Sequence, residues 1–216
     1  MRNAQKDAAE MAEKRERMLK CGFELFSSRA IEPVTMQEIA SKSGIGIATI
    51  YRYFPSKLEF VIEIAVQRWK DFLTYVKEED EKTHIFDKTA AEQFAHYLDY
   101  YILLYREHRD HLRFNYDFNL YVVNSGATKE QMKEFTETVS GFASQFDRIY
   151  ETGMRDGTLR TDVTADELFA SSAHIMLAVA TRYSAGLMFH AQKVNDDCAE
   201  LEMLKDMITD RFTVKR

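Results

Sequence analysis

Proline, glycine and cysteine are scarce in this chain of 216 residues, which contains two prolines, eight glycines and two cysteines. Proline and glycine are the residues that most disfavour helix interiors, so their scarcity favours a largely helical fold. The sequence also lacks an alternating strand pattern of useful length and an internal repeat. Apolar residues make up 45% of the chain and charged residues 30%, a balance typical of a globular protein rather than a disordered one.

Long hydrophobic runs are absent as well, since no stretch approaches the roughly 18–20 apolar residues of a membrane span. The N-terminal segment MRNAQKDAAEMAEKRER is polar and charged, unlike a secretory signal. The two cysteines, Cys21 and Cys198, lie far apart in sequence. We therefore expect a cytoplasmic protein with reduced thiols and no membrane partner.

Motifs of catalysis are missing too: there is no phosphate loop, no nucleophile motif and no zinc-ligand spacing. His108 and His111 are three residues apart beside Glu107, but REHRDH is also an ordinary charged helix end. Whether these two histidines bind a metal is left open, and His174 is expected in the core. The sequence therefore predicts no enzymatic activity, no metal and no cofactor.

The formal net charge of −6 is unevenly distributed along the chain. Residues 1–60 carry ten basic against eight acidic side chains, whereas the remainder carries nineteen against twenty-seven. A low overall pI does not exclude a local nucleic-acid footprint, and the basic excess lies in the N-terminal part.

Apolar residues recur at helical spacing through most of the sequence. Two Thr-x-x-Glu segments, Thr35 to Glu38 and Thr164 to Glu167, are capping boxes that mark helix starts. Gly44 ends a short helix after the first of them, and the charged stretch 77–89 is interpreted as a linker. The expected helices are 8–28, 35–43, 46–53, 56–77, 90–108, 110–124, 128–156, 165–191 and 198–212.

Two of these helices are short and joined by a turn containing Gly44, which is the pattern of a helix-turn-helix. In such a unit the second helix enters the major groove of DNA and the first crosses the backbone. A small core is expected to fix the pair, formed by Met36, Ile39, Ala40, Ile45, Ile50 and Phe54. The second helix is then expected to expose Ile47, Ala48, Thr49, Tyr51, Arg52 and Tyr53.

The segments MLKCGFELF and TMQEIASKSGIGIATIYRYFPSKLEF resemble the N-terminal domain of the TetR (tetracycline-repressor-like) family of bacterial transcriptional regulators. The run from Ala48 to Lys57, ATIYRYFPSK, carries the family's hallmark. The resemblance covers about residues 18–64. It implies an all-α fold, with a three-helix helix-turn-helix domain at 1–55 and a larger helical effector and dimerisation domain at 56–216. The helix 56–77 would connect the two.

The resemblance also assigns expected roles at the DNA. Thr35, Tyr53 and Lys57 would anchor phosphates, because helix starts with free N–H groups favour anions. Arg52 is the candidate reader of guanine, and Ile47 would pack on a thymine methyl. The full predicted set is Thr35, Gly46, Ile47, Ala48, Thr49, Tyr51, Arg52, Tyr53 and Lys57. The chain departs from the family pattern at Gly46, Ile47 and Ala30.

A homodimer is the expected partner state, formed through helices at about 165–191 and 198–212. Ala170, Ala173, Leu177, Thr181 and Ser184 form a stripe of mainly small residues on the first of these helices. Leu201, Leu204, Ile208 and Phe212 form an apolar stripe on the second. The alternative is that both stripes pack only within one chain.

Six of the 11 tyrosines lie in residues 97–121. Tyrosine is a costly choice for a dry core because each buried hydroxyl needs a hydrogen-bond partner. We therefore predict a pocket for a largely apolar or aromatic small-molecule effector, although an ordinary aromatic core remains the alternative. The acids Asp99, Glu107 and Asp117 would also permit a cation. The candidate pocket residues are Tyr97, Tyr101, Tyr105, Phe114 and Phe118.

The sequence thus predicts a homodimeric DNA-binding transcriptional regulator. A repressor released from a pseudo-palindromic operator by a small effector is the favoured form. The rival hypotheses are a DNA-binding protein controlled by a protein partner with no small-molecule effector, and a helical enzyme whose N-terminal unit merely resembles the motif.

Overall fold

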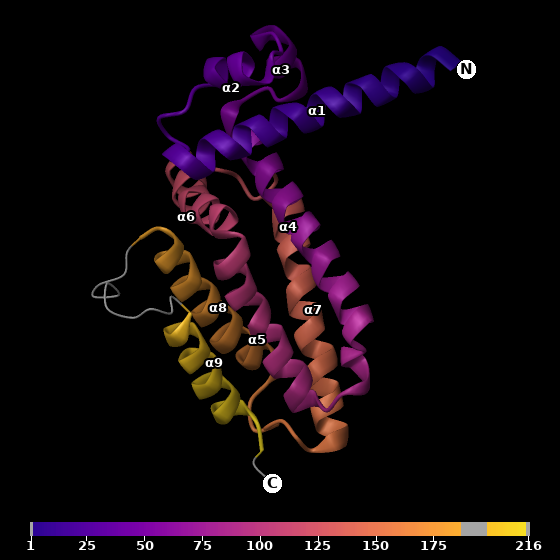
Figure 1. Cartoon of the computed structure of the whole chain (residues 1–216), viewed down its shortest axis with the longest axis vertical. Helices are drawn as coiled ribbons and strands as arrows, with labels where there is room; N and C mark the ends of the chain where they lie inside the picture. Colours follow the sequence, from indigo (N-terminus) through magenta and orange to yellow (C-terminus); the bar gives the residue numbers. More distant parts are fainter. Residues whose placement is uncertain (1, 187–197, 215–216) are drawn as a thin grey trace. The chain divides into compact units, whose positions relative to one another are not determined.

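The computed structural model describes residues 2–186 and 198–214, and it confirms the all-α fold class. Figure 1 shows its helices in chain order. They are α1 (Arg2–Arg29), α2 (Met36–Ser43), α3 (Ile47–Tyr53), α4 (Lys57–Thr83), a 3-10 turn η1 (Ile85–Asp87), α5 (Ala90–Glu107), α6 (Arg109–Asn124), α7 (Lys133–Asp156), α8 (Ala165–Ser184) and α9 (Ala199–Phe212). Across these ranges the only β-type pairing is an isolated bridge of Leu159 with Thr213.

The chain divides into two compact units. Unit 1 contains Met1–Arg68 and Arg113–Thr136, and unit 2 contains Trp69–Leu112 and Glu137–Arg216. Three helices therefore contribute residues to both units, namely α4, α6 and α7. No helix in the described ranges is both long enough and apolar enough to cross a membrane.

The core of unit 1 is built on phenylalanine rings. Phe60 of α4 packs edge-on against Phe54, with ring centroids 4.9 Å apart, and Phe26 of α1 lies 6.1 Å from Phe60. Gly22 makes this packing possible, because a Cβ there would lie only 2.4 Å from the Phe60 ring. The predicted helix-turn-helix core residues are all buried in the same cluster, which confirms that part of the prediction.

Three capping boxes fix the starts of α2, α5 and α8. The boxes at Thr35 and Thr164 confirm the sequence prediction, with each threonine hydroxyl accepting from the backbone N–H of the glutamate three residues on. The third box, from Thr89 to Glu92, lies at the end of the predicted linker and was not predicted. The sequence Thr-Ala-Ala-Glu follows the same pattern and could have revealed it.

The stretch 77–89 differs from the linker that its charge suggested. Helix α4 continues to Thr83, and the 3-10 turn η1 follows it. Asp80 explains the extension, because its side chain is only 1% exposed and accepts hydrogen bonds from Tyr97 and Tyr100 of α5. This charged segment therefore contains a carboxylate, that of Asp80, which is buried and hydrogen-bonded to another helix.

Unit 2 is organised around α5, which packs against α8 and α9, while α8 and α9 pack against each other. Phe94 of α5 lies 6.1 Å from both Phe146 of α7 and Phe212 of α9. Helix α8 ends at Ser184, and the predicted extension to residue 191 falls largely outside the described residues. Helix α7 begins at Lys133, later than the expected residue 128.

Candidate functional sites: a nucleic-acid interface and an aromatic cluster

The turn between α2 and α3 depends on Gly44. Its φ of 66° and ψ of 24° lie in the left-handed region, where glycine has no Cβ penalty. From there its N–H donates to the carbonyls of Ala40 and Ser41 and closes α2. Helix α3 then begins at Ile47, and its N-cap Gly46 offers no side-chain hydrogen bond to the first N–H groups of the helix.

The start of α2 is held by Thr35, Glu38 and Arg29. The Thr35 N–H donates to Glu38 Oε2 over 2.8 Å, and the Arg29 guanidinium donates to Glu38 Oε1 over 2.7 Å. These contacts hold the pKa of Glu38 at about 2, with the backbone hydrogen bond from Thr35 as the largest cause. Thr35 is exposed, but its hydroxyl is already paired with Glu38, donating to Oε2 over 3.0 Å and accepting from the Glu38 N–H over 3.2 Å.

Helix α3 has a buried side and an exposed side. Ile50 is fully buried, whereas Ala48, Tyr51 and Arg52 are exposed, with Tyr51 at 47%. Ile47 differs from the fully exposed position expected for it. It is half-buried and packs on the core, because residues 47, 50 and 54 recur on one face of the short helix.

Arg52 and Tyr53 are the last two residues of α3. Tyr53 is half-buried and packs against the unit 1 core, and its ring lies 6.3 Å from that of Phe54. The Arg52 guanidinium carbon lies 5.9 Å from the Tyr53 ring centroid. Thr49 is half-buried and Gly46 is exposed. The predicted α3 residues therefore lie on or beside one short helix but differ in how exposed they are.

Lys57 begins α4, and its ammonium is already engaged. Nζ donates to the Glu32 carbonyl over 3.0 Å and lies 5.3 Å from the Tyr121 ring centroid. Burial lowers the pKa of Lys57, although Glu32 and Glu38 act in the opposite direction. The lysine therefore joins the start of α4 to the α1–α2 turn and to α6 within unit 1.

Sequence reasoning missed three partners of this surface: Arg29, Glu32 and Tyr121. Arg29 could have been found from the local pattern, since it lies at the end of α1, close in sequence to Glu38. No local signal connects Lys57 with Tyr121, because 64 positions separate them in the numbering and only the fold brings them together.

The five predicted effector residues are divided between the two units. Tyr97, Tyr101 and Tyr105 lie on α5 in unit 2, and all three are buried. Phe114 and Phe118 stack on each other at 6.0 Å and belong to the unit 1 core. Helical spacing indicates which of these residues share one side of a helix, but it does not indicate which other helices that side packs against.

A cluster of aromatic rings that was not singled out lies in unit 2, and we call it the Trp69 cluster. Trp69 and Phe72 of α4 both face Phe142 of α7, at 5.5 and 6.0 Å. The His111 ring lies 4.7 Å from Trp69. The complete set is Trp69, Phe72, Tyr75, Tyr100, His108, His111 and Phe142.

Asp80 adds a carboxylate beside this cluster. It accepts from the hydroxyl of Tyr100 over 2.7 Å and that of Tyr97 over 2.8 Å, and His96 Nε2 lies 3.2 Å away. Burial opposes ionisation of Asp80, but the hydrogen bonds from His96, Tyr100 and Tyr97 outweigh it and lower its pKa. In the described part of the chain, no group of three or more His, Cys, Asp or Glu side chains could hold a metal ion.

The outer faces of α8 and α9 carry apolar side chains other than the predicted stripes. Of the predicted stripe on α9, Leu201, Ile208 and Phe212 are buried within the chain, and Leu204 is half-buried. The exposed apolar residues are instead Ile175 at 44% and Met203 and Met207 at 63% each. We call these three residues the α8–α9 face.

Comparison with known proteins places the helix-turn-helix in a family. Residues 19–64 match the family described as bacterial regulatory proteins, tetR family. HTH-type transcriptional regulators of Staphylococcus aureus, including that of strain USA300, are 30% identical over 72 residues, which is 33% of this chain. The match spans 39% of the length of those curated relatives.

Solved structures share the fold over nearly the whole chain. A transcriptional regulator from Saccharomonospora viridis in complex with choline has a TM-score of 0.75 at 19% identity, over 94% of this chain and 100% of that one. FadR from Bacillus subtilis in complex with stearoyl-CoA has a TM-score of 0.65 at 18% identity, over 90% and 97%. A TetR family protein from Vibrio parahaemolyticus has a TM-score of 0.66 at 20% identity, over 94% and 100%. Residues 19–64 thus match the tetR family of bacterial regulatory proteins, and the solved structures share the fold of the chain beyond that match.

Proposed function

We propose that the protein is a homodimeric, DNA-binding transcriptional repressor that a small effector releases from a pseudo-palindromic operator. The observation that carries the proposal is α3, a short helix anchored by the fully buried Ile50 that presents Ala48, Tyr51 and Arg52 outward. A helix held in this way can enter the major groove with its outer side chains at base edges.

The roles at the DNA follow from chemistry. Arg52 matches the O6 and N7 acceptors of guanine, and the Ala48 methyl suits contact with thymine. Thr35, Tyr53 and Lys57 are proposed to supply hydroxyl and ammonium groups to phosphate, which would position the protein without reading sequence. Gly46, Ile47, Thr49 and Tyr51 complete the proposed surface, with Ile47 limited to its half-exposed edge.

A second copy of the chain is required by the geometry of such a site. Two recognition helices about 34–36 Å apart reach successive major grooves of a pseudo-palindrome. The α8–α9 face supplies exposed apolar surface for a self-complementary contact.

We place the effector in unit 2, at the Trp69 cluster and the tyrosines of α5. Ring faces suit an apolar or aromatic ligand and also attract an organic cation. Structural relatives bound to choline and to stearoyl-CoA support ligand binding by this fold. To turn operator occupancy from 99:1 to 1:99, the effector must prefer the released conformation by about 5.5 kcal/mol.

Selection of bound DNA from a random pool tests the DNA-binding part of the proposal. We expect an enriched pseudo-palindrome whose affinity falls steeply with salt, because each phosphate contact releases counterions. Arg52→Ala should relax the preference at one base position by about 1–3 kcal/mol. Weak binding with a flat salt dependence and no enriched site would refute the proposal.

Intrinsic fluorescence tests the effector part, because Trp69 is the only tryptophan of the chain. A true effector should stabilise the protein saturably, change Trp69 emission and release the selected operator. Phe142→Leu, which removes a ring beside Trp69, should weaken all three responses together. A ligand that releases DNA without affecting Trp69 would place the effector site elsewhere.

A further inference from the structure

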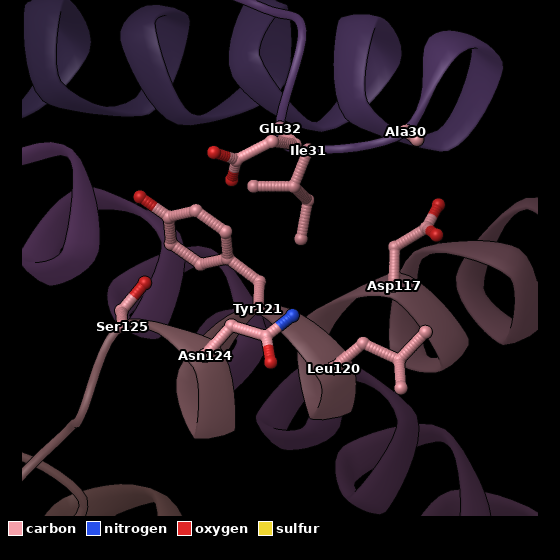
Figure 2. A pocket seen from close by; sticks show the side chains of 8 residues that line it. All are labelled: Ala30, Ile31, Glu32, Asp117, Leu120, Tyr121, Asn124 and Ser125. Carbon is pink, nitrogen blue, oxygen red and sulfur yellow. The ribbon is translucent and has the colours of Figure 1, made fainter.

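A pocket of about 390 Å³ lies in unit 1, under the turn that leads from α1 into the helix-turn-helix. Figure 2 shows its wall from α6 facing the residues of that turn. The volume is in the range of small-molecule sites. Its lining residues are Ala30, Ile31, Glu32, Asp117, Leu120, Tyr121, Asn124 and Ser125.

The charge of this pocket has one sign. Glu32 and Asp117 are its only ionisable carboxylates, and no lysine, arginine or histidine lines it. Burial alone raises the pKa of the Asp117 carboxyl, since no hydrogen bond or neighbouring charge acts on it within the described residues. A half-buried carboxylate without such compensation is stabilised by any cation that reaches it.

The two carboxylates are separated by apolar surface. In Figure 2 they lie on opposite sides of the Ile31 side chain, with Leu120 on the facing helix. Ile31 is almost fully buried, whereas Leu120 is 52% exposed, so the apolar strip is open at its outer edge. An occupant that satisfies this arrangement has a positive group at each end and methylene groups between them.

The chain itself shows that an ammonium is accepted beside the pocket. The Lys57 ammonium is held by the Glu32 carbonyl and the face of the Tyr121 ring, and both of these residues also line the pocket. Lys57 offsets part of the charge of Glu32, whereas burial raises the pKa of Asp117. Of the two carboxylates, that of Asp117 should therefore gain more from a bound cation.

We infer that this pocket binds a small aliphatic diamine, with one ammonium at Asp117, the other at Glu32, and the methylene chain against Ile31 and Leu120. The site is distinct from the effector region of unit 2. It would make the DNA-binding unit responsive to a second class of ligand.

Calorimetric titration of the full chain with 1,4-diaminobutane tests the inference without DNA or effector, so its failure would leave the proposed function standing. We expect saturable binding of one diamine per chain and weaker binding of butylamine. Asp117→Asn should weaken diamine binding by about fivefold or more, the effect of losing one ion pair, and Glu32→Gln by less.

Two further variants keep the test decisive. Glu130→Gln removes one exposed carboxylate from unit 1 outside the pocket and should leave the affinity unchanged. Leu120→Lys places an ammonium in the pocket from an exposed position and should abolish diamine binding without unfolding the unit. The inference is overturned if Asp117→Asn and Glu130→Gln weaken binding equally, or if Leu120→Lys binds diamine as the wild type does.

Discussion

Gly22 of α1 is the residue at which helix propensity and packing oppose each other. An alanine there would gain about 1 kcal/mol of helix propensity. Its Cβ, however, would lie 2.4 Å from the Phe60 ring and 2.9 Å from Ile64 Cδ1, so the fully buried Phe60 would have to shift. Overpacking of this kind costs about 1–3 kcal/mol, so Gly22→Ala should lower the free energy of unfolding by about 1 kcal/mol.

Gly141 of α7 provides the matched control for that measurement. A Cβ there meets only Leu73 Cδ1 at 3.8 Å, which is an ordinary contact. Gly141→Ala should therefore raise the free energy of unfolding by about 0.5–1 kcal/mol. Urea denaturation of both variants checks the pair, and stabilisation by Gly22→Ala would show that α1 and α4 can move apart at no cost.

Lys57 is the residue whose two possible roles can be separated by experiment. If its ammonium reaches DNA phosphate, Lys57→Gln should weaken binding to every sequence equally and reduce the salt slope by about one per subunit. If it only links α4 to Glu32 and Tyr121, the variant should lose stability and keep the wild-type slope. We expect the change in slope, measured by fluorescence anisotropy of labelled DNA over a range of NaCl concentrations.

The start of α2 is capped in part by the Glu38 carboxylate, so the stability of the protein should depend on pH in the range where this group titrates. The pKa of Glu38 falls from 4.5 to about 2 on folding, through hydrogen bonds from Thr35 and Arg29. A carboxyl with a lowered folded pKa contributes stability that is complete above about pH 4.5 and is lost as the pH falls towards 2. The difference in unfolding free energy between wild type and Glu38→Gln should shrink over this interval.

Because other carboxyls also titrate below pH 4.5, only that difference is informative. Urea denaturation at pH 7, 4 and 3 measures it. A difference that stays constant across the three pH values would mean that Glu38 caps α2 equally well when protonated.

The junction of α4 and α5 depends on the buried Asp80. Asp80→Asn puts an amide N–H₂ where the hydroxyls of Tyr97 and Tyr100 now donate, so one donor is left without an acceptor. The expected cost is about 1–3 kcal/mol. Tyr100→Phe, which removes only one donor, should cost about 1 kcal/mol. Urea denaturation of both single variants and the double variant measures the coupling, and additive losses would contradict a shared network.

Local sequence rules identified those helix ends that are encoded locally. The Thr-x-x-Glu boxes at Thr35 and Thr164 and the stop at Gly44 depend on residues within one turn of each other, and each was predictable. The extension of α4 to Thr83 was not, because it depends on Asp80 meeting tyrosines of another helix. The charges around Asp80 resemble a solvated linker until those partners are known.

At the scale of the whole molecule, the division of the chain into two units was the feature that the sequence predicted least well. Aromatic spacing on α5 and α6 predicted buried faces, and Tyr97, Phe114 and Phe118 are indeed buried. Periodicity does not specify which neighbours a face meets, so one predicted pocket became two separate sets of rings in different units. The helix-turn-helix was more predictable because it is formed within about twenty consecutive residues.

The α8–α9 face carries the last prediction, because a pseudo-palindromic operator requires two copies of the chain. Met203 and Met207 lie one helical turn apart and are both 63% exposed, a costly arrangement for a monomer and a suitable one for the centre of a dimer contact. The double substitution Met203→Glu with Met207→Glu should place four carboxylates at that contact and produce monomers at micromolar concentration. Operator affinity should fall by at least about tenfold, since a single recognition helix loses its paired half-site.

Sedimentation analysis measures the assembly of this double variant, and anisotropy measures its affinity for DNA. Met154→Glu is the matched control, since Met154 is 58% exposed on α7 and lies outside the α8–α9 face. It should remain dimeric and bind the operator as the wild type does. If the double variant stays dimeric, the copies meet elsewhere; if it becomes monomeric and keeps its operator affinity, one helix-turn-helix is enough for recognition.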